Sequence, residues 1–466
     1  MVYASFLWLA WLASCIEALS PHQDAAIVTI PIQRVENGPS QLRKRTDVYR
    51  PDISYTAVLA LGNPPQQITV QMDTTIGYLM VTAYNSSYCN EIHCLTKSFL
   101  DISSSSTYKD LGRKFNITTP SHYNFQGTFA TETLTVNGEL VSPKADIVVN
   151  FGSNLGNIVG MGYVADDSDS YTGFLQSLVD IGKLKLSAYS LYMKDNPGER
   201  GTIVLGGVNT AKYTGNLYTM PLPAVNGTRY LPSVLVTGIG ITGINKTHSS
   251  GLPVYAVLNP GMSATYLPDS IVEDIYNDFG AWFDPVAQMG MINCTERYRG
   301  YNLTFGFTDF NISVPLADFI TMPRDPSKCE FALLPSGKET AMLGDTFMHR
   351  AYTFYDFSHN EISMAQTDFN SDPDTLTEIQ AGGLSDAIPD VISVSVTASA
   401  PVPTTMFKPY VTDFPLTDSP SDSPSTSSAS SAPDATSTST GGGVGPTGSP
   451  HNVMAGLIGA GLLLAL

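Results

Sequence analysis

The sequence predicts an all-β protein in which one loop pattern occurs twice. From residue 52 to about residue 192, short runs of alternating apolar and polar residues are separated by Gly, Asn, Pro and Ser, which indicates antiparallel strands. A strand–turn–strand pattern occurs first over residues 70–81 and again over residues 254–268. With 466 residues and 42% hydrophobic content, the chain can form two or three average domains or one large two-lobed one.

The first copy of the pattern carries one acidic residue, Asp73, between two apolar runs. A buried carboxylate is costly unless it is hydrogen-bonded or has a chemical role. Asp73 is therefore a catalytic candidate, and the alternative is an aspartate that begins an Asx-turn between two core strands. In the second copy Asn259 stands at the equivalent position and is followed by Pro260 and Gly261.

Together the two copies resemble the active-site loops of pepsin-family (A1) aspartic proteases, in which each lobe supplies one Asp-Thr-Gly. The resemblance covers residues 52–366. Further segments similar to family landmarks follow in the same order, namely residues 157–162, 201–208, 213–215, 341–348 and 352–356. The resemblance implies an all-β, bilobal pepsin-like fold with a few short helices and a cleft between the lobes. Its N-terminal lobe would span residues 46–214 and its C-terminal lobe residues 215–366.

The family mechanism implies two close carboxylates that share one proton. One activates the attacking water and the other protonates the scissile carbonyl oxygen. Here Asp73 retains the acid, whereas Asn259 supplies an amide, which cannot exchange a proton at useful pH. A helix expected over residues 270–279, directly after the second loop as in the family, places Asn259 at the catalytic position.

Neighbouring positions also differ from the family pattern. Thr74 is retained, but Pro260 replaces the second threonine and removes a hydroxyl and an N–H from the reciprocal bracing that the resemblance implies. Thr75 replaces a glycine, and Ile76 and Met262 replace hydroxyl residues that orient the carboxylates in the family. These changes predict a non-catalytic member, with a weakly active endopeptidase that uses the remaining acid as the alternative.

Residues 123–130 stand where the family has a flap over the cleft, and Tyr123 is the candidate flap tyrosine, with an ordinary hairpin aromatic as the alternative. The acidic cluster of Asp166, Asp167 and Asp169 lacks the ligand spacing of an EF-hand and is expected to be a solvated loop. The sequence therefore predicts no metal site and no cofactor.

Of the five cysteines, Cys15 falls in an expected signal peptide, which leaves Cys89, Cys94, Cys294 and Cys329. In a secreted protein this even set predicts two disulfides, for which the sequence alone permits three pairings. The resemblance implies Cys89–Cys94 and Cys294–Cys329. A metal site is the weaker alternative, because there is no CxxC pair and no cluster of histidines nearby.

The N-terminal region carries sorting and processing signals. Residues 1–20 contain an apolar run that is too short to span a membrane and predict a secretory signal peptide. Residues 21–45 end in Arg43-Lys44-Arg45 and resemble a propeptide cut by a kexin-type enzyme. The alternative for this basic sequence is an ordinary surface loop.

The C-terminal region is low in complexity. Residues 367–443 are predicted to form a Ser/Thr/Pro-rich stalk that buries too little apolar surface to fold. Residues 444–466 match a GPI-attachment signal that is removed, with a tail-anchored segment as the alternative. The expected attachment residues are Ser439, Gly441, Gly442 and Gly443.

The formal charge of −18 argues against nucleic-acid binding, because there is no basic patch to neutralise phosphates. Sequons for N-glycosylation support passage through the secretory pathway and stand at Asn85, Asn116, Asn226, Asn245, Asn293, Asn302 and Asn311. The arrangement resembles a yapsin-type fungal surface protease. It implies a monomer at the plasma membrane or cell wall, with a GPI anchor in the membrane and a peptide or protein ligand in the cleft.

Overall fold

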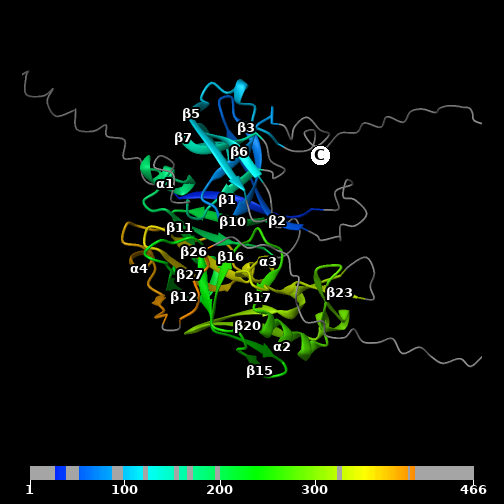
Figure 1. Cartoon of the computed structure of the whole chain (residues 1–466). Coiled ribbons are helices and arrows are strands. Elements are labelled where there is room, and N and C mark those ends of the chain that lie inside the picture. The colour runs from blue at the N-terminus through cyan, green and yellow to red at the C-terminus, as the bar shows by residue number, and fades with distance from the viewer. Residues whose placement is uncertain are drawn as a thin grey trace, which may run out of the picture. The chain divides into compact units, whose positions relative to one another are not determined.

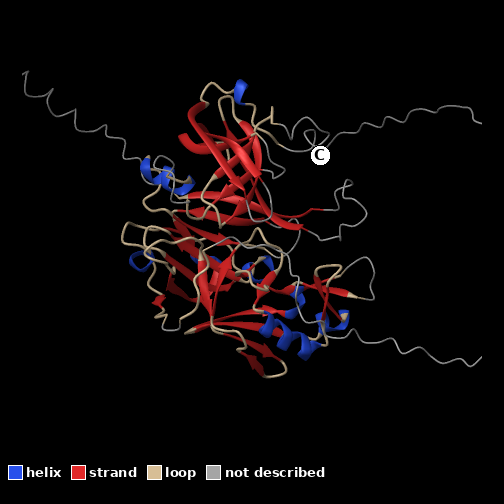
Figure 2. Cartoon of the chain, viewed as in Figure 1, coloured by secondary structure: helices blue, strands red, loops and turns tan. Residues whose placement is uncertain are grey.

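The computed structural model describes residues 27–37, 52–86, 98–118, 124–151, 157–164, 172–194, 200–322, 328–396 and 399–404. These residues belong to one compact unit, which consists mainly of strands with a few short helices (Figure 2). The predicted all-β fold class is confirmed. No helix within the described ranges is long and apolar enough to cross a membrane. The expected signal peptide, dibasic sequence and GPI signal lie outside these ranges.

The largest sheet has 14 strands. In chain order they are β1 (Val28–Asn37), β2 (Asp52–Leu61), β3 (Gln66–Asp73), β4 (Leu79–Thr82), β5 (Lys109–Thr118), β6 (Asn124–Val136), β7 (Glu139–Asn150), β8 (Asn157–Gly160), β9 (Ala188–Tyr192), β10 (Arg200–Leu205), β12 (Tyr213–Pro221), β26 (Ala351–Asp356), β27 (Glu361–Thr367) and β29 (Val391–Ser393). Their order across the sheet is β29-β12-β27-β26-β9-β10-β1-β2-β3-β8-β4-β7-β6-β5. The sheet therefore joins strands from both ends of the sequence, with β1 and β10 near its middle (Figure 1).

Smaller sheets form the C-terminal lobe. The five-stranded sheet contains β13 (Ser233–Val236), β16 (Val254–Leu258), β17 (Thr265–Leu267), β24 (Leu333–Pro335) and β25 (Ala341–Leu343). The first four-stranded sheet contains β14 (Gly238–Thr242), β15 (Lys246–His248), β20 (Asn302–Phe307) and β21 (Phe310–Pro315). The second contains β18 (Trp282–Asp284), β19 (Met289–Ile292), β22 (Ile320–Thr321) and β23 (Cys329–Phe331). A further two-stranded sheet, from residues outside the range expected for that lobe, pairs β11 (Gly207–Asn209) with β28 (Leu376–Glu378).

The described α-helices are short: α1 (Phe174–Asp180), α2 (Asp269–Phe279), α3 (Asp345–Met348) and α4 (Leu384–Ala387). Helix α2 occupies the position expected for the helix after the second loop. Ile271, Ile275 and Phe279 are buried on one face because they recur every four residues. The helix follows β17 directly, as the registration of the second loop requires.

One disulfide joins Cys294 to Cys329 with an S–S distance of 2.15 Å, as the resemblance implies. It ties the segment before β20 to β23. Cys89 and Cys94 lie outside the described residues, so their pairing stays a prediction.

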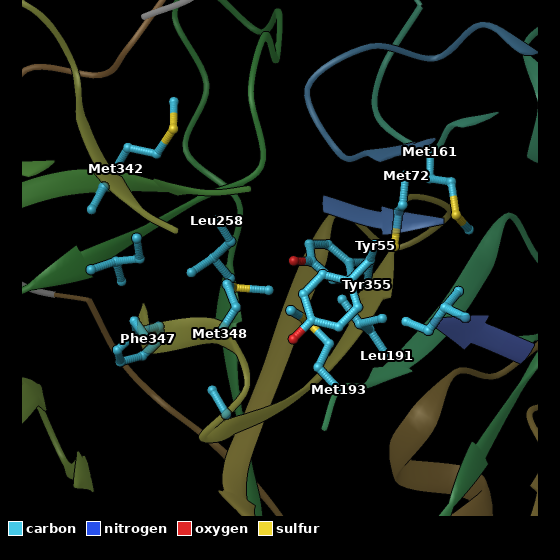
Figure 3. Packing of buried hydrophobic residues seen from close by; sticks show 14 of the residues in the cluster. Tyr55, Met72, Met161, Leu191, Met193, Leu258, Met342, Phe347, Met348 and Tyr355 are labelled. Atoms are coloured by element: carbon cyan, nitrogen blue, oxygen red, sulfur yellow. The ribbon is translucent and has the colours of Figure 1, made fainter. Parts of the chain in front are cut away.

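The main hydrophobic core is continuous across both lobes. Figure 3 shows Met72 and Met161 from the N-terminal lobe in the same cluster as Leu258 and Met348 from the C-terminal part of the chain. Tyr355 of β26 lies within this cluster. The two halves of the sequence are therefore packed as one body, which fixes the loops at the ends of β3 and β16.

The folded region extends beyond both boundaries expected from the sequence. Residues 28–37, expected to belong to a propeptide, form β1 of the large sheet. Residues 376–393, expected to belong to a stalk, form β28, α4 and β29. In this second segment Ile379, Leu384 and Ile388 are buried against Tyr352 and Phe354, because they supply apolar side chains at intervals within an otherwise polar stretch.

Candidate active site

The first loop begins where β3 ends at Asp73. Oδ1 of Asp73 accepts the backbone N–H of Thr75 at 2.7 Å and the Thr75 hydroxyl at 2.5 Å. The aspartate thus makes the Asx-turn that was the alternative to a catalytic role. The Thr75 hydroxyl also fixes the orientation of the carboxylate, although the family's hydroxyl residue at position 76 is an isoleucine here.

The second loop begins directly after β16, at Asn259. Its side-chain Oδ1 accepts the backbone N–H of Gly261 at 2.8 Å, which matches the Asp73–Thr75 contact in the first loop. Because the amide oxygen of Asn259 accepts this hydrogen bond, the NH₂ group of the same side chain can donate to a different acceptor.

Asp73 and Asn259 face each other. The Asn259 side chain lies near enough to the Asp73 carboxylate to lower its pKa by hydrogen-bonding interaction. Both side chains also converge on Gly261: a Cβ at that position would lie 3.0 Å from Asn259 Oδ1 and 3.7 Å from Asp73 Oδ2. The structure therefore brings together the acid and the amide that the sequence registration pairs.

Burial raises the pKa of Asp73 above its ordinary value. Hydrogen bonds from Thr75, Asn259 and the Ile76 backbone offset only part of this rise. The amide carries no charge, so it cannot split the titration of the site into an acid and a base as a second carboxylate does.

Half of the expected bracing between the loops is present. The hydroxyl of Thr74, which is fully buried, donates to the backbone carbonyl of Leu258 at 2.5 Å. Pro260 occupies the corresponding position of the second loop and has neither a hydroxyl nor an N–H to return the contact.

A glycine-containing segment passes behind each loop. Behind the first loop, Met161 donates its backbone N–H to Asp73 O at 2.9 Å, and a Cβ at Gly162 would lie 2.2 Å from Thr74 O. Behind the second, Asn259 donates its backbone N–H to Leu343 O at 3.1 Å. A Cβ at Gly344 would lie 2.2 Å from Ala264 O, so both segments need glycine for close backbone approach.

Aromatic side chains pack beside the first loop. Tyr78, Phe115 and Phe129 form edge-on and tilted contacts with ring centroids 5.2–6.1 Å apart, and Ile76 packs against this cluster. Phe115 and Phe129 come from β5 and β6, the two strands of the hairpin expected to form the flap. Tyr123 itself lies outside the described residues.

Sequence reasoning missed two parts of this site. The first is the Thr75 hydroxyl, which could have been found by noting that a threonine two residues after an aspartate can bond to it. The second is the aromatic cluster, since Phe115 and Phe129 are separated from Tyr78 along the chain and only the sheet brings them together.

The described residues contain no group of three or more His, Cys, Asp or Glu side chains placed to hold a metal ion. The acidic cluster at residues 166–169 lies outside the described ranges, as do the expected attachment residues Gly441, Gly442 and Gly443. Among the sequons Asn302 is half-buried, and the exposed ones are Asn85, Asn116, Asn226, Asn245, Asn293 and Asn311.

The paired loops, their glycine segments and the flanking strands define the chain's class, and sequence comparison agrees. The family model described as Eukaryotic aspartyl protease matches residues 54–367, and the chain belongs to this family with its two-lobed pepsin-like fold. It is 31% identical over 424 residues to "Probable aspartic-type endopeptidase opsB" of Aspergillus oryzae, covering 83% of this chain and 87% of that protein.

Two further relatives carry more specific names. "Aspartic proteinase yapsin-3" of Saccharomyces cerevisiae is 28% identical over 392 residues, covering 77% of this chain and 76% of that protein. "Secreted aspartic protease 8" of Candida albicans is 30% identical over 344 residues, covering 72% and 81%.

Proposed function

We propose that this protein is a non-catalytic aspartic-endopeptidase-like protein of the cell surface, which binds a peptide or protein segment between its lobes without cutting it. The observation that carries the proposal is that the Asn259 amide and the Asp73 carboxylate converge on Gly261, with its would-be Cβ 3.0 Å from Asn259 Oδ1 and 3.7 Å from Asp73 Oδ2. In this family the corresponding pair consists of two acids, and one of them must donate a proton that an amide cannot release.

The chemistry of the pair suits binding better than cleavage. Asp73 can still orient a water, and an amide NH₂ group has a second hydrogen with which to hold a carbonyl oxygen. Without a second acid, nothing in this pair protonates the departing amine, which removes roughly 10²–10⁴-fold of rate. A peptide would therefore be held in its ground state.

Localisation at the cell surface is supported by the named relatives, since one is a yapsin and another a secreted protease. The proposal includes secretion through the signal peptide, N-glycosylation at exposed sequons and anchoring through a GPI group near Gly441–Gly443. It further takes the protein as a monomer whose partners are the membrane and the bound peptide.

A weakly active endopeptidase is the second candidate. The Thr75 hydroxyl favours it, because this contact keeps the Asp73 carboxylate in a fixed orientation. Such an enzyme would need another proton donor, supplied by the substrate or by solvent.

The test compares the secreted protein with its Asp73→Ala variant on a denatured protein substrate at about pH 3–5, with and without pepstatin. We expect no pepstatin-sensitive cleavage from either form. Binding is read separately, by fluorescence anisotropy of a labelled peptide, and should weaken in Asp73→Ala. Pepstatin-sensitive cleavage that Asp73→Ala abolishes would contradict the non-catalytic assignment and favour the second candidate.

A further inference from the structure

The segment between β28 and β29 is held to the rest of the protein by few contacts. Within the described part of the chain, residues 381–389 exchange hydrogen bonds only with one another and with Gln380. Their attachment depends on Leu384 and Ile388, which are each 5% exposed and belong to the cluster that contains Phe354. Figure 1 shows α4, the helix of this segment, on the side of the molecule where β12 and β27 lie. A segment with so few contacts opens more readily than the sheet beneath it.

A histidine lies directly beneath this segment. Nδ1 of His359 lies 2.8 Å from Oδ2 of Asp356, and the side chain of Asp356 is 3% exposed. A Cβ at Gly383 would lie 3.3 Å from Nδ1 and Cε1 of His359 and 3.8 Å from Asp356 Oδ2. The backbone of the segment therefore packs against the His359–Asp356 pair.

Acidic side chains surround His359 from three elements. The charges of Asp356 on β26, Glu361 on β27 and Asp386 on α4 all act on it. Among the ion pairs of the described residues, His359 is the only cation paired with Asp356, and none is paired with Glu361 or Asp386. Protonated His359 is thus the charge that lets Asp386 lie close to the other two acids.

Other charged groups lie at the margins of this cluster. Tyr163 is within electrostatic range of Asp356, and Arg229 acts on Tyr163. Lys185 Nζ binds Glu378 at 3.2 Å and Gln380 at 2.6 Å, just before the segment begins. These contacts hold β28 and leave residues 381–389 dependent on the cluster around His359.

The titrations in this cluster act in one direction. The hydrogen bond with Asp356 raises the pKa of His359 above its ordinary value; burial opposes this rise, and the charges of Asp356, Glu361 and Asp386 add to it. Burial, and after it the charge of Asp356, raise the pKa of Glu361. The stability from protonated His359 is therefore present below about pH 6.5 and is lost as pH rises through the folded pKa. Ionisation of Glu361 adds a second repulsion as pH rises.

We propose that residues 381–389 are a proteolytic release site, kept closed at acidic pH by the contact with His359 and opened toward neutral pH. In the closed state Leu384 and Ile388 are buried, so an endopeptidase that cuts beside apolar side chains cannot bind them. In the open state it hydrolyses one peptide bond of the segment: the C–N bond breaks, one water adds, and a new carboxyl and a new amino terminus form.

The cut would separate the two-lobed domain from everything that follows it. The family model ends at residue 367, so no residue of the matched domain is lost. The part removed contains β29 and the proposed GPI signal. Only release from the membrane rests on the proposed anchoring; the opening and the cut do not, and neither depends on whether Asp73 takes part in catalysis.

The first experiment treats the purified full chain with proteinase K and locates the cuts by mass spectrometry. Each cutting rate is divided by the rate on unfolded casein at the same pH, which corrects for the protease's own pH dependence. We expect cutting within residues 381–389 to be at least about threefold faster at about pH 7.5 than at about pH 5, because proteolysis follows the population of the open segment. An equal or lower corrected rate at the higher pH would overturn the proposal.

The second experiment changes the charge at position 359. His359→Gln cannot be protonated and should reduce the ratio between the two pH values to less than about 1.5-fold. His359→Arg stays charged and should keep the segment closed at both pH values. The matched control is His248→Gln, because His248 also lies beside two acids, Asp274 and Asp278, but on β15 and α2. It should leave the ratio unchanged, and an unchanged ratio in His359→Gln would contradict the proposal.

The third experiment removes the charge that the segment itself carries. Asp386→Asn should slow the corrected cutting at about pH 7.5 by at least about twofold, whereas Asp390→Asn, at an exposed aspartate just after the segment, should have less than about half that effect. Hydrogen exchange of the Ile388 amide, which donates to Leu384 O at 2.9 Å, measures the same opening without a protease. Its protection should fall toward neutral pH, and equal protection at both pH values would overturn the proposal.

Discussion

The two loops at the centre of the molecule have the same backbone frame but different side-chain chemistry. In each, an Asx-type bond closes the turn, from Thr75 N to Asp73 or from Gly261 N to Asn259. In each, a glycine segment passes behind the loop. The backbone frame of both loops, meaning their turns and the glycine segments behind them, is therefore retained although the second acid is lost. This backbone also helps to form the core, whereas the second carboxylate serves only catalysis.

The two loops differ in the contact that each makes to the other loop and in the contacts of the polar side chain that each carries. The first keeps its brace through Thr74 and gains a hydroxyl contact to the acid through Thr75. The second has Pro260 in place of the brace and an amide in place of the acid. Substitutions that make the two loops more alike, or less alike, test this comparison.

Restoring the second loop should have the largest effect. We expect Asn259→Asp alone to raise peptidase activity at about pH 3–5 by less than about tenfold, because the brace at Pro260 is still absent. Asn259→Asp combined with Pro260→Thr should raise it by about 10²–10⁴-fold, since it returns both the acid and the cross-loop contact. Cleavage of a quenched fluorescent peptide measures both.

The control for this restoration is Asp73→Ala in the doubly substituted background, which should remove the gained activity. Full recovery by Asn259→Asp alone would mean that the second brace is dispensable.

The shared frame predicts that Gly162→Ala and Gly344→Ala are equally damaging. Each new Cβ would lie 2.2 Å from a backbone oxygen, which cannot move without displacing a loop. We expect a loss of about 3–5 kcal/mol in the free energy of unfolding, measured by chemical denaturation. Gly240→Ala is the matched control, because its nearest neighbour would be 3.7 Å away. A tolerated alanine at only one of the two positions would show that the frames are not equivalent.

The hydrogen bond from Thr74 to Leu258 should contribute less to the free energy of unfolding than the two glycines behind the loops. Thr74→Val keeps the shape of the side chain but leaves the buried Leu258 carbonyl without this donor. We expect a loss of about 1–3 kcal/mol in the free energy of unfolding. Thr242→Val, at an exposed threonine, should change stability by less than about 0.5 kcal/mol. A neutral Thr74→Val would show that the cross-loop contact contributes nothing.

The Thr75 hydroxyl should control the titration of Asp73. Because its hydrogen bond lowers the pKa of Asp73 against the larger effect of burial, Thr75→Val should raise that pKa further. The folded-state pKa lies above the unfolded value, so ionising Asp73 costs stability as pH rises through the folded pKa, and the variant should deepen this loss. Carbon-13 NMR of the Asp73 carboxyl gives the pKa directly. A fall in the pKa would contradict the orienting role of Thr75.

The regions behind the loops should differ in pH dependence. Tyr163 behind the first loop is neutral and donates to Asn360 at 3.2 Å, whereas Asp345, His349 and Asp318 behind the second are linked. Burial opposes protonation of His349, but hydrogen bonding to Asp318 and the charges of Asp345 and Asp318 raise its pKa overall.

This raised pKa contributes stability that is fully present below about pH 6.5 and is lost as pH rises through the folded pKa. His349→Gln should therefore cost about 1 kcal/mol at pH 5 and less at a pH above the folded-state pKa, measured by urea denaturation. Tyr163→Phe should show no such difference between the two pH values. An effect of His349→Gln that is the same at both pH values would contradict the charged pairing.

Local patterns predicted much of this molecule. The apolar alternation that leads into Asp73 and the four-residue spacing of α2 both depend on neighbours in sequence, and both are present. The facing of Asp73 and Asn259 followed from counting along two similar loops. The Cys294–Cys329 bond followed from the family resemblance.

Long-range pairing was the part that sequence could not supply. Residues 28–37 read equally well as a removable segment, because nothing local indicates that β10, far along the chain, pairs with them. Residues 376–393 have a polar composition, and only their contacts with Tyr352 and Phe354 give the scattered apolar side chains a partner. The role of Thr75 depended on a rotamer, which composition does not fix.

The last strand has a mechanical consequence. Strand β29 runs parallel to β12 at the edge of the large sheet, and Val394 directly after it donates its N–H to Thr219 O at 2.8 Å. Tension applied to the chain's C-terminal end therefore loads this short edge strand before any strand that carries Asp73 or Asn259. Under such tension the segment from β28 to β29 detaches first, and the two loops that carry Asp73 and Asn259 keep their relative positions.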